Sequence, residues 1–350
     1  MSVRMDFYRE IFYWLKHLRY FDTKCSLWDA LELARGDILK KERMPLPRAI
    51  QLEPTTKCNF SCITCTRKTL PKSRLNKDLT IQDFRVILEN IPTLKIIKLQ
   101  GLGEPLMNQY IWEILECGRE RGIRFSTTTN GSLLNPSNIE KLLKYFDSIC
   151  VSIDSINPEN LEYIRKGVKY ESIMKNLELL VEIKREVSAR ADVGINFVAT
   201  HLNYREIPAL CNLASKLRLN FIYIVEVENW TTPKEKEYHQ QLEFIREARK
   251  VKREIRSLIL DSRRKYRELS IYHGDSSRRK LRCSWCFSKC FITVDGYITP
   301  CCIRMNPDVF NFGNIFDESF NNIWNGEKMR EFRLSMIKDR ANPICDQCPD

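Results

Sequence analysis

The stretch "EPTTKCNFSCITCTRK", Glu53 to Lys68, decides how the rest of the chain is interpreted, because it places three thiols on one short segment. Cys58, Cys62 and Cys65 are spaced C-x3-C-x2-C. Thiolates are soft ligands that select zinc, copper(I) or iron–sulfur clusters. A closed zinc site needs four ligands, and no other Cys or His lies nearby in the sequence. An iron–sulfur cube held at three irons would leave its fourth iron open to a substrate or cofactor.

The composition limits the class of protein. The chain has 350 residues with 43% hydrophobic content, which suits one large domain and a smaller one. It contains no run of about 18 apolar residues that could span a membrane. The first residues, "MSVRMDFYREIFYWLKHLRYF", lack the apolar core and cleavage site of a signal peptide. We therefore predict a cytoplasmic protein.

The cysteine content points to a metal, whereas the net charge leaves several partners open. In a reducing compartment, fourteen cysteines favour metal binding over disulfides. The formal net charge of +12 is compatible with nucleic acid, with an acidic protein, or simply with a solvated basic surface. Zinc-like cysteines on a basic chain would also suit a nucleic-acid-binding metalloprotein. We regard that alternative as weaker, because it does not explain a site with three ligands.

Strand and helix patterns alternate from residue 48 onward. Expected strands cover residues 49–53, 95–101, 123–131, 148–154, 192–200 and 220–227, and expected helices cover 80–91, 109–122, 136–146, 158–187 and 204–217. Such alternation predicts parallel strands with helices outside, in an open sheet or a barrel. The pattern stops near Val227, so a full eight-unit barrel is not expected.

Four regions follow from these patterns. Residues 1–47 carry an apolar stripe at helical spacing and are predicted to form an N-terminal helical cover. Residues 48–230 hold the alternating units. Residues 231–280 are charged and helix-prone, and we predict a helical connector there. Residues 281–350 turn cysteine-rich and short-stranded, which predicts a small α+β metal-binding domain.

Five short motifs occur in order along the alternating units. They are "CNFSCITC" (58–65), "GLGEP" (101–105), "TTNG" (128–131), "VSIDS" (151–155) and "IRKG" (164–167). The first four lie at or just after the carboxyl ends of expected strands, where α/β folds gather their ligands. Together they resemble the radical S-adenosylmethionine (radical SAM) superfamily, across residues 48–230 and on into the C-terminal domain. The resemblance implies an α/β fold with a partial (β/α)6 TIM-like barrel.

The resemblance also implies which residues hold the cofactor. Cys58, Cys62 and Cys65 would bind a [4Fe–4S] cluster whose open iron is chelated by the amino and carboxylate groups of S-adenosylmethionine. The remaining implied contacts belong to the methionyl end and the ribose. Backbone at Gly101, Gly103 and Glu104 would accept the methionyl ammonium, with glycines allowing close approach, and Arg165 could pair with the carboxylate.

Other contacts are implied less directly. Ser152 and Asp154 are two residues apart on one expected strand and share a face, so they suit the ribose hydroxyls or the carboxylate. Asn130 would orient the ribose or form a turn with the following glycine. The sequence departs from the family pattern in two places. Leu102 replaces a glycine, and Thr64 replaces an aromatic residue before the third cysteine, which puts the adenine contact in doubt.

A second cysteine group resembles the SPASM/Twitch domains that follow many radical SAM cores. "CSWCFSKCFITVDGYITPCC" (283–302) contains C-x12-G-x4-C, and Asp295-Gly296 suits a β-hairpin turn. The resemblance implies that four cysteines hold one auxiliary [4Fe–4S] cluster. These are Cys283, Cys301, Cys345 and Cys348. Cys286 or Cys290 could replace the first and Cys302 the second, and a structural zinc is the alternative occupant.

The reaction implied by the resemblance is reductive cleavage of S-adenosylmethionine to a 5′-deoxyadenosyl radical, which abstracts a substrate hydrogen atom. A fully ligated second cluster suits an electron acceptor, so we expect a net two-electron oxidation by a radical SAM oxidoreductase. The alternative is a peptide or protein maturase that forms a thioether or a formylglycine-type product. A flavodoxin or ferredoxin-type donor could dock on the basic face. The substrate, a small molecule or a peptide, is not identified, and neither is its base among Asn196, His201 and Glu226.

Overall fold

The computed structural model describes residues 40–226, 249–274, 283–338 and 343–345, and also residues 19–20, 23–24, 28 and 31. Its centre is a nine-stranded sheet with the order β11-β10-β3-β4-β5-β6-β7-β8-β9. From β10 to β9 all neighbouring strands are parallel, and only β10 and β11 pair antiparallel. The strands are β3 (Ala49–Leu52), β4 (Ile96–Leu99), β5 (Arg124–Thr129), β6 (Phe146–Ser152), β7 (Asp192–Ala199), β8 (Phe221–Glu226), β9 (Ser270–Gly274), β10 (Phe291–Ile292) and β11 (Ile298–Thr299).

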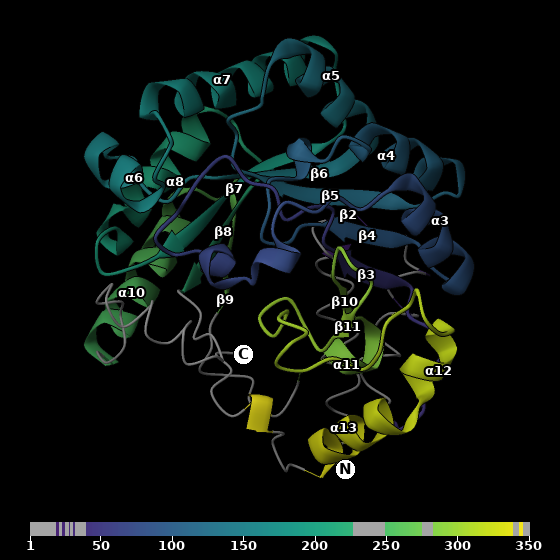
Figure 1. Cartoon of the computed structure of the whole chain (residues 1–350). Coiled ribbons are helices and arrows are strands. Elements are labelled where there is room, and N and C mark those ends of the chain that lie inside the picture. Colours follow the sequence, from purple (N-terminus) through teal and green to yellow (C-terminus); the bar gives the residue numbers. More distant parts are fainter. Residues whose placement is uncertain are drawn as a thin grey trace.

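Helices line the outer side of the parallel strands (Figure 1). They are α3 (Ile81–Asn90), α4 (Ile111–Glu120), α5 (Pro136–Tyr145), α6 (Pro158–Ile164), α7 (Tyr170–Glu186), α8 (Ile207–Lys216) and α10 (Arg249–Lys265). Local sequence sets where they begin. Thr80 and Asp83 form the expected capping box on α3, and Pro136 occupies the first turn of α5 behind the Asn135 cap. The predicted partial (β/α)6 barrel is confirmed.

Alternate strand residues separate the hydrophobic core from the barrel interior. Ile97 and Leu99 are fully buried and belong to the core between sheet and helices. Lys98, between them, must point to the opposite face. Its ammonium lies 6.0 Å from the ring centre of Tyr223, although β4 and β8 are not neighbours in the sheet. The curvature of the sheet therefore brings these strands together around a polar interior.

The region predicted as a helical connector holds one more barrel unit. It contains α10 and then β9, which pairs parallel with β8. Ile271 of β9 is buried, as are Ile255 and Ile259 of α10, so this strand and helix close one end of the core. The prediction of helix alone was wrong at β9. A five-residue strand with one strongly apolar position gives too short an alternation to detect.

The C-terminal cysteine-rich region continues the barrel sheet. The Cys290 carbonyl accepts a 3.0 Å hydrogen bond from the Gln51 amide, and the Ile292 carbonyl accepts one of 2.9 Å from the Glu53 amide. Strand β10 thus lies directly beside β3, as Figure 1 shows. The expected hairpin turn is present, with Gly296 at φ +86°. This region also holds three helices, α11 (Trp285–Ser288) before the hairpin and α12 (Phe320–Asn325) and α13 (Glu327–Ile337) after it.

The segment before β3 is bound to the C-terminal helices. The Trp324 indole donates to the Pro45 carbonyl at 2.8 Å, and Asn325 exchanges two hydrogen bonds with the Met44 backbone. Most of the predicted N-terminal cover lies outside the described residues. Arg19–Tyr20 (β1) and Thr23–Lys24 (β2) form a short antiparallel pair where a helix was expected. In the described part of the chain, no helix has the length and apolar character needed to cross a membrane.

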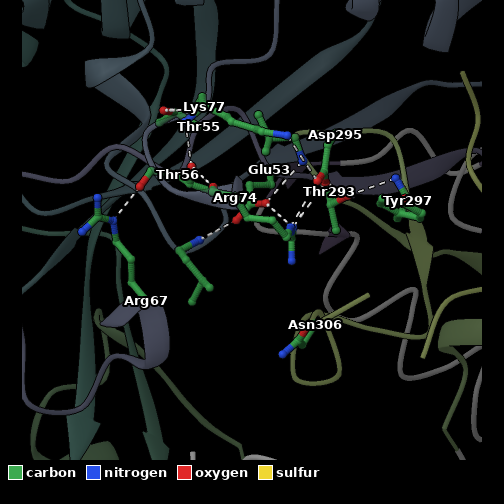
Figure 2. Close-up of polar contacts among 12 residues, drawn as sticks. Glu53, Thr55, Thr56, Arg67, Arg74, Lys77, Thr293, Asp295, Tyr297 and Asn306 are labelled. Carbon is green, nitrogen blue, oxygen red and sulfur yellow. Dashed lines mark hydrogen bonds and ion pairs between the residues drawn. The ribbon is translucent and has the colours of Figure 1, made fainter. Parts of the chain in front are cut away.

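A buried charge network joins the two cysteine regions (Figure 2). Arg74, which ends the short 3-10 helix Lys72–Arg74, forms a two-pronged contact with Asp295 at 3.2 and 3.3 Å and lies 3.6 Å from a Glu53 oxygen. The Glu53 carboxylate also accepts the amides of Leu102 and Val294 at 3.1 and 3.2 Å. Burial raises the pKa of Glu53, and these amides together with Arg74 oppose the rise. One arginine therefore connects the barrel to the hairpin turn.

Replacing Arg74 should loosen this connection. The Arg74→Met variant leaves the Glu53 carboxylate, which is 2% exposed, without its cation, and leaves Asp295 with the Lys77 ammonium at 3.9 Å. We expect a loss of about 3 kcal/mol in the free energy of unfolding. Urea denaturation of the iron-loaded proteins under anaerobic conditions measures it. Lys72→Met, at an exposed position on the same short helix, is the control. Equal stabilities of the two variants would contradict the assigned role.

Candidate active site and metal centres

The first cysteine segment leaves β3 and is fixed to the end of α6. The amide of Ser61 donates to the Lys166 carbonyl at 2.8 Å, and the amide of Ile63 donates to the Ile164 carbonyl at 2.9 Å. This backbone pairing holds the loop at the carboxyl end of the barrel, where the motif around Arg165 also lies. Two parts of the chain about a hundred residues apart are thus brought to one site.

The three thiols of this loop suit a cluster held at three corners. Burial raises the pKa of Cys62 to about 12 and also raises that of Cys65, with Arg165 opposing the rise at both and the neighbouring thiols reinforcing it. Such thiols ionise only when a metal takes the proton's place. The amides of Phe60 and Arg67 lie 3.5 Å from the sulfurs of Cys58 and Cys65, as donors to metal-bound sulfur do.

A single zinc ion fits this loop less well. Among the residues that the structure describes, no three Cys, His, Asp or Glu side chains converge as ligands of one metal ion. A cubane separates its thiolates by its own bulk, so its ligands do not need to meet at one point. The donor set on this loop therefore fits an iron–sulfur cube better than a mononuclear site.

The "GLGEP" turn is packed against the cysteine loop. A Cβ at Gly103 would clash with the carbonyl oxygens of Thr55 and Lys57, and one at Gly101 would clash with the Glu53 side chain. The Glu104 amide then donates to the Lys57 carbonyl at 2.7 Å. The two glycines thus have a packing reason for being small. Their predicted contact with the methionyl ammonium stays a prediction.

Glu104 itself joins the turn to the end of β5. Its buried carboxylate accepts hydrogen bonds from the Thr129 hydroxyl at 2.7 Å, the Asn130 amide at 2.6 Å and the Leu106 amide at 3.3 Å. Burial raises the pKa of Glu104, and these donors oppose the rise. Its side chain therefore positions the turn against the end of β5. Its backbone is also engaged, since its amide donates to Lys57 and its carbonyl accepts the Met107 amide at 2.9 Å, and the predicted cofactor contact stays a prediction.

Asn130 forms the turn that its sequence context suggested. Its side-chain oxygen accepts from the Ser132 amide at 2.9 Å, and Gly131 has φ +80°. Its side-chain nitrogen donates to Asn59 of the cysteine loop at 2.8 Å. Asn130 therefore connects the end of β5 to the metal-binding loop, and a contact with ribose is not needed to explain it.

Asp154 and Arg165 form a buried ion pair of 2.7 Å beside the thiols. The other Asp154 oxygen accepts the Val198 amide at 2.8 Å, so this carboxylate orients the arginine and the neighbouring strand. Burial opposes the Arg165 charge, but Asp154 and Cys62 raise the pKa of Arg165 above its usual value. Ser152, at the end of β6, lies in register with Asn196. Of the predicted pair Ser152 and Asp154, it is Asp154 whose side chain forms the ion pair and the backbone hydrogen bond.

Three of the four predicted ligands of the auxiliary cluster, Cys283, Cys301 and Cys345, lie in the described part of the chain. The thiol of Cys283 is close enough to raise the pKa values of both Cys286 and Cys301. The thiol of Cys345 likewise raises the pKa of Cys286. Burial raises the pKa of Cys301, and the amides of Ile303 and Arg304 oppose the rise by hydrogen bonding to its sulfur. Cys348 lies outside the described residues.

Two of the spare cysteines differ in their surroundings. Cys286 lies among the predicted ligands. Cys290 is also fully buried, but its only charged neighbour among the described residues is Arg333. Cys286 is therefore close to the predicted cluster site, and the alternative of Cys290 as a ligand stays a prediction.

Three side chains of the barrel interior were missed by the sequence analysis. Tyr223 and Tyr272 stack with ring centres 4.7 Å apart, and Lys98 faces Tyr223 from across the barrel. The signal was a lysine inside the apolar strand "KIIKLQG". Of the candidate bases, His201 is exposed, and Glu226 is engaged by Lys252 at 3.2 Å and His273 at 3.6 Å.

Comparison with known proteins agrees with these two sites. Residues 52–214 match the Radical SAM superfamily, and residues 283–349 match the SPASM iron-sulfur cluster-binding domain. The chain therefore contains a radical SAM domain followed by a C-terminal SPASM domain. These domains imply three cofactors, a [4Fe–4S] cluster that binds S-adenosylmethionine, an auxiliary iron–sulfur cluster, and S-adenosylmethionine itself.

Relatives cover most of the chain at low identity. A probable GTP 3′,8-cyclase of Methanococcus maripaludis (strain C5) is 26% identical over 307 residues, 85% of this chain and 96% of that protein. An AdoMet-dependent heme synthase of Methanosarcina barkeri is 26% identical, over 82% and 85% of the two chains. The solved structure of Streptococcus suis SuiB with S-adenosylmethionine shares the fold, with a TM-score of 0.67 at 18% identity over 92% and 76%.

Cysteine substitutions should separate the two metal sites. We expect the triple variant Cys58→Ala, Cys62→Ala, Cys65→Ala to keep roughly four of about eight irons, because the auxiliary cluster remains. Cys301→Ser should lose the other four, whereas Cys290→Ser should lose none. Iron and sulfide analysis after anaerobic reconstitution gives the counts. Loss of a cluster in Cys290→Ser would show that this buried thiol is a ligand.

Proposed function

We propose that this chain is a radical SAM oxidoreductase that removes two electrons from its substrate, with the auxiliary cluster as the electron acceptor. The observation that carries the proposal is the pairing of β10 with β3. Strand β3 leads into the first cysteine loop, and β10 lies between Cys290 and Cys301 of the second cysteine region. Both metal-binding segments are thus attached to one hydrogen-bonded strand pair, an arrangement suited to electron transfer.

The residues at the carboxyl ends of the strands would bind and orient S-adenosylmethionine. A cluster bound by Cys58, Cys62 and Cys65 supplies the electron that splits the sulfonium. Arg165, aligned by Asp154 at 2.7 Å, would hold the methionyl carboxylate. Its buried position beside the thiols supports this assignment, because a guanidinium there could pair with a carboxylate bound next to the cluster.

The barrel interior would hold the substrate. Lys98, Tyr223 and Tyr272 give this space one ammonium and two stacked rings. Such a surface suits a substrate with an anionic group and a flat or apolar part. The oxidation balances if the substrate gives one hydrogen atom to the adenosyl radical, one electron to the auxiliary cluster and one proton to a base or to water.

The named relatives do not determine the substrate. They include proteins named as a cyclase, a heme synthase and a modifier of a tungsten-enzyme cofactor. A peptide maturase is the competing assignment, and the fold likeness to SuiB does not decide between the two. The net charge of +12 supports a small acidic electron donor of the flavodoxin or ferredoxin type.

Anaerobic turnover tests the proposed oxidation. The reconstituted protein, a reduced flavodoxin and S-adenosylmethionine are incubated with small-molecule extracts or with peptide pools, and products are followed by mass spectrometry. We expect faster formation of 5′-deoxyadenosine with the substrate, and a product that lacks two hydrogen atoms. A product that keeps all its hydrogens would replace the proposal by an isomerase. A cross-linked peptide also lacks two hydrogen atoms, so fragmentation that locates the loss in a new bond between two side chains would assign a maturase instead.

Substitution of Lys98 tests the assignment of the interior. Lys98→Met removes the interior ammonium, and we expect at least tenfold lower kcat/KM for an anionic substrate, about 1.4 kcal/mol in transition-state binding. Cleavage of S-adenosylmethionine without substrate should be unchanged, because Lys98 is not among the residues at the cofactor end. Lys141→Met, at an exposed position on α5, is the control. Equal kinetics in both variants would remove Lys98 from the substrate site.

A further inference from the structure

Arg333 of α13 is a fully buried cation. Its Nε donates to the Cys286 carbonyl at 2.7 Å, and its Nη1 donates to the Glu42 carbonyl at 2.9 Å and, at 3.4 Å, to the side-chain oxygen of Asn325. The guanidinium carbon lies 4.3 Å from the ring centre of Trp324. Its Nη2 is buried and has no hydrogen-bond partner among the described residues.

All these partners of Arg333 are uncharged. They are two backbone carbonyls, one amide oxygen and an aromatic ring. Within the described part of the chain, no Asp or Glu forms an ion pair with this guanidinium. A buried charge without a counter-charge lowers the stability of the folded protein. A negatively charged group close to Arg333 would offset this cost. Burial lowers the pKa of Arg333 to about 10, and nearby thiols oppose the fall.

The thiols that oppose the fall in the pKa of Arg333 belong to the auxiliary metal region. They are Cys286 and Cys290. The first of them neighbours Cys283 and Cys345, two of the predicted ligands of the auxiliary cluster. The residues therefore fit a cluster at this place, because a [4Fe–4S] centre with four thiolates carries net negative charge, which a buried guanidinium would balance.

We propose that Arg333 is the counter-charge of the auxiliary cluster and raises its reduction potential. Reduction adds one electron to an already anionic centre, so a nearby cation with no carboxylate of its own favours the reduced form. The inference extends the proposed function, since it states why this cluster would accept the substrate's electron. Arg333 is a positioning and charge-tuning residue, and it does not touch the substrate.

A redox titration tests this role without turnover. The full chain carries the Cys58→Ala, Cys62→Ala, Cys65→Ala background, so that only the auxiliary cluster titrates, and its signal is followed by electron paramagnetic resonance. Arg333→Met should shift the midpoint potential of the auxiliary cluster to a more negative value. We expect the equilibrium constant for reduction to fall at least tenfold, which corresponds to about 59 mV for one electron. Arg333→Lys and Lys338→Met, an exposed position just after α13, should stay near the parent value.

Two comparisons keep the test decisive. Both Arg333 variants lose the fork that binds Cys286 and Glu42, so an equal shift in Met and Lys would assign Arg333 a structural role only and overturn the proposal. An unchanged potential in Arg333→Met would also overturn it. If Arg333→Met does not retain iron, Arg333→Gln replaces it with the same expected shift. The potentials are measured without substrate, so failure of the proposed oxidation would leave this result standing.

Discussion

The backbone pairing of β3 with β10 is the constraint on which both metal sites depend. Strand β3 has four residues, all buried, and it is hydrogen-bonded to β4 on one edge and β10 on the other. Its last residue, Leu52, is followed by Glu53, whose carboxylate accepts amides from the "GLGEP" turn and from the hairpin segment. A shift of β3 by one residue would turn its side chains to the opposite face, and both cysteine segments would lose their placement.

The sequence predicted the parts of the fold that arise from local pattern. The alternation of strands and helices, the capping box at Thr80 and the hairpin at Gly296 all depend on a few adjacent residues. The motifs of the candidate site were found for the same reason, since four of the five sit where a strand ends, and the fifth, around Arg165, ends helix α6. Geometry then added roles that spacing does not contain, such as the Asn130 contact to Asn59.

The features that the sequence did not reveal arise from pairings between distant residues. Arg74 and Asp295 are 221 positions apart, and nothing in the surroundings of either marks the partner. Strand β9 was missed because its alternation is too short, and the shared sheet was missed because β10 has only two residues. In a basic sequence, a buried arginine cannot be told from one on the surface. Arg333 was therefore recognised only from its burial in the folded structure.

The two metal sites place an arginine in opposite electrostatic settings. At the first site, Arg165 is paired with Asp154 at 2.7 Å, so the carboxylate offsets much of the cation's effect on the neighbouring thiols. A centre that must reduce a sulfonium needs a low potential, and a neutralised cation helps to keep it low. At the second site, Arg333 has only uncharged hydrogen-bond partners, so its charge acts on the thiols directly. Under the proposed function, this difference in pairing would favour electron donation at the first cluster and electron acceptance at the auxiliary cluster.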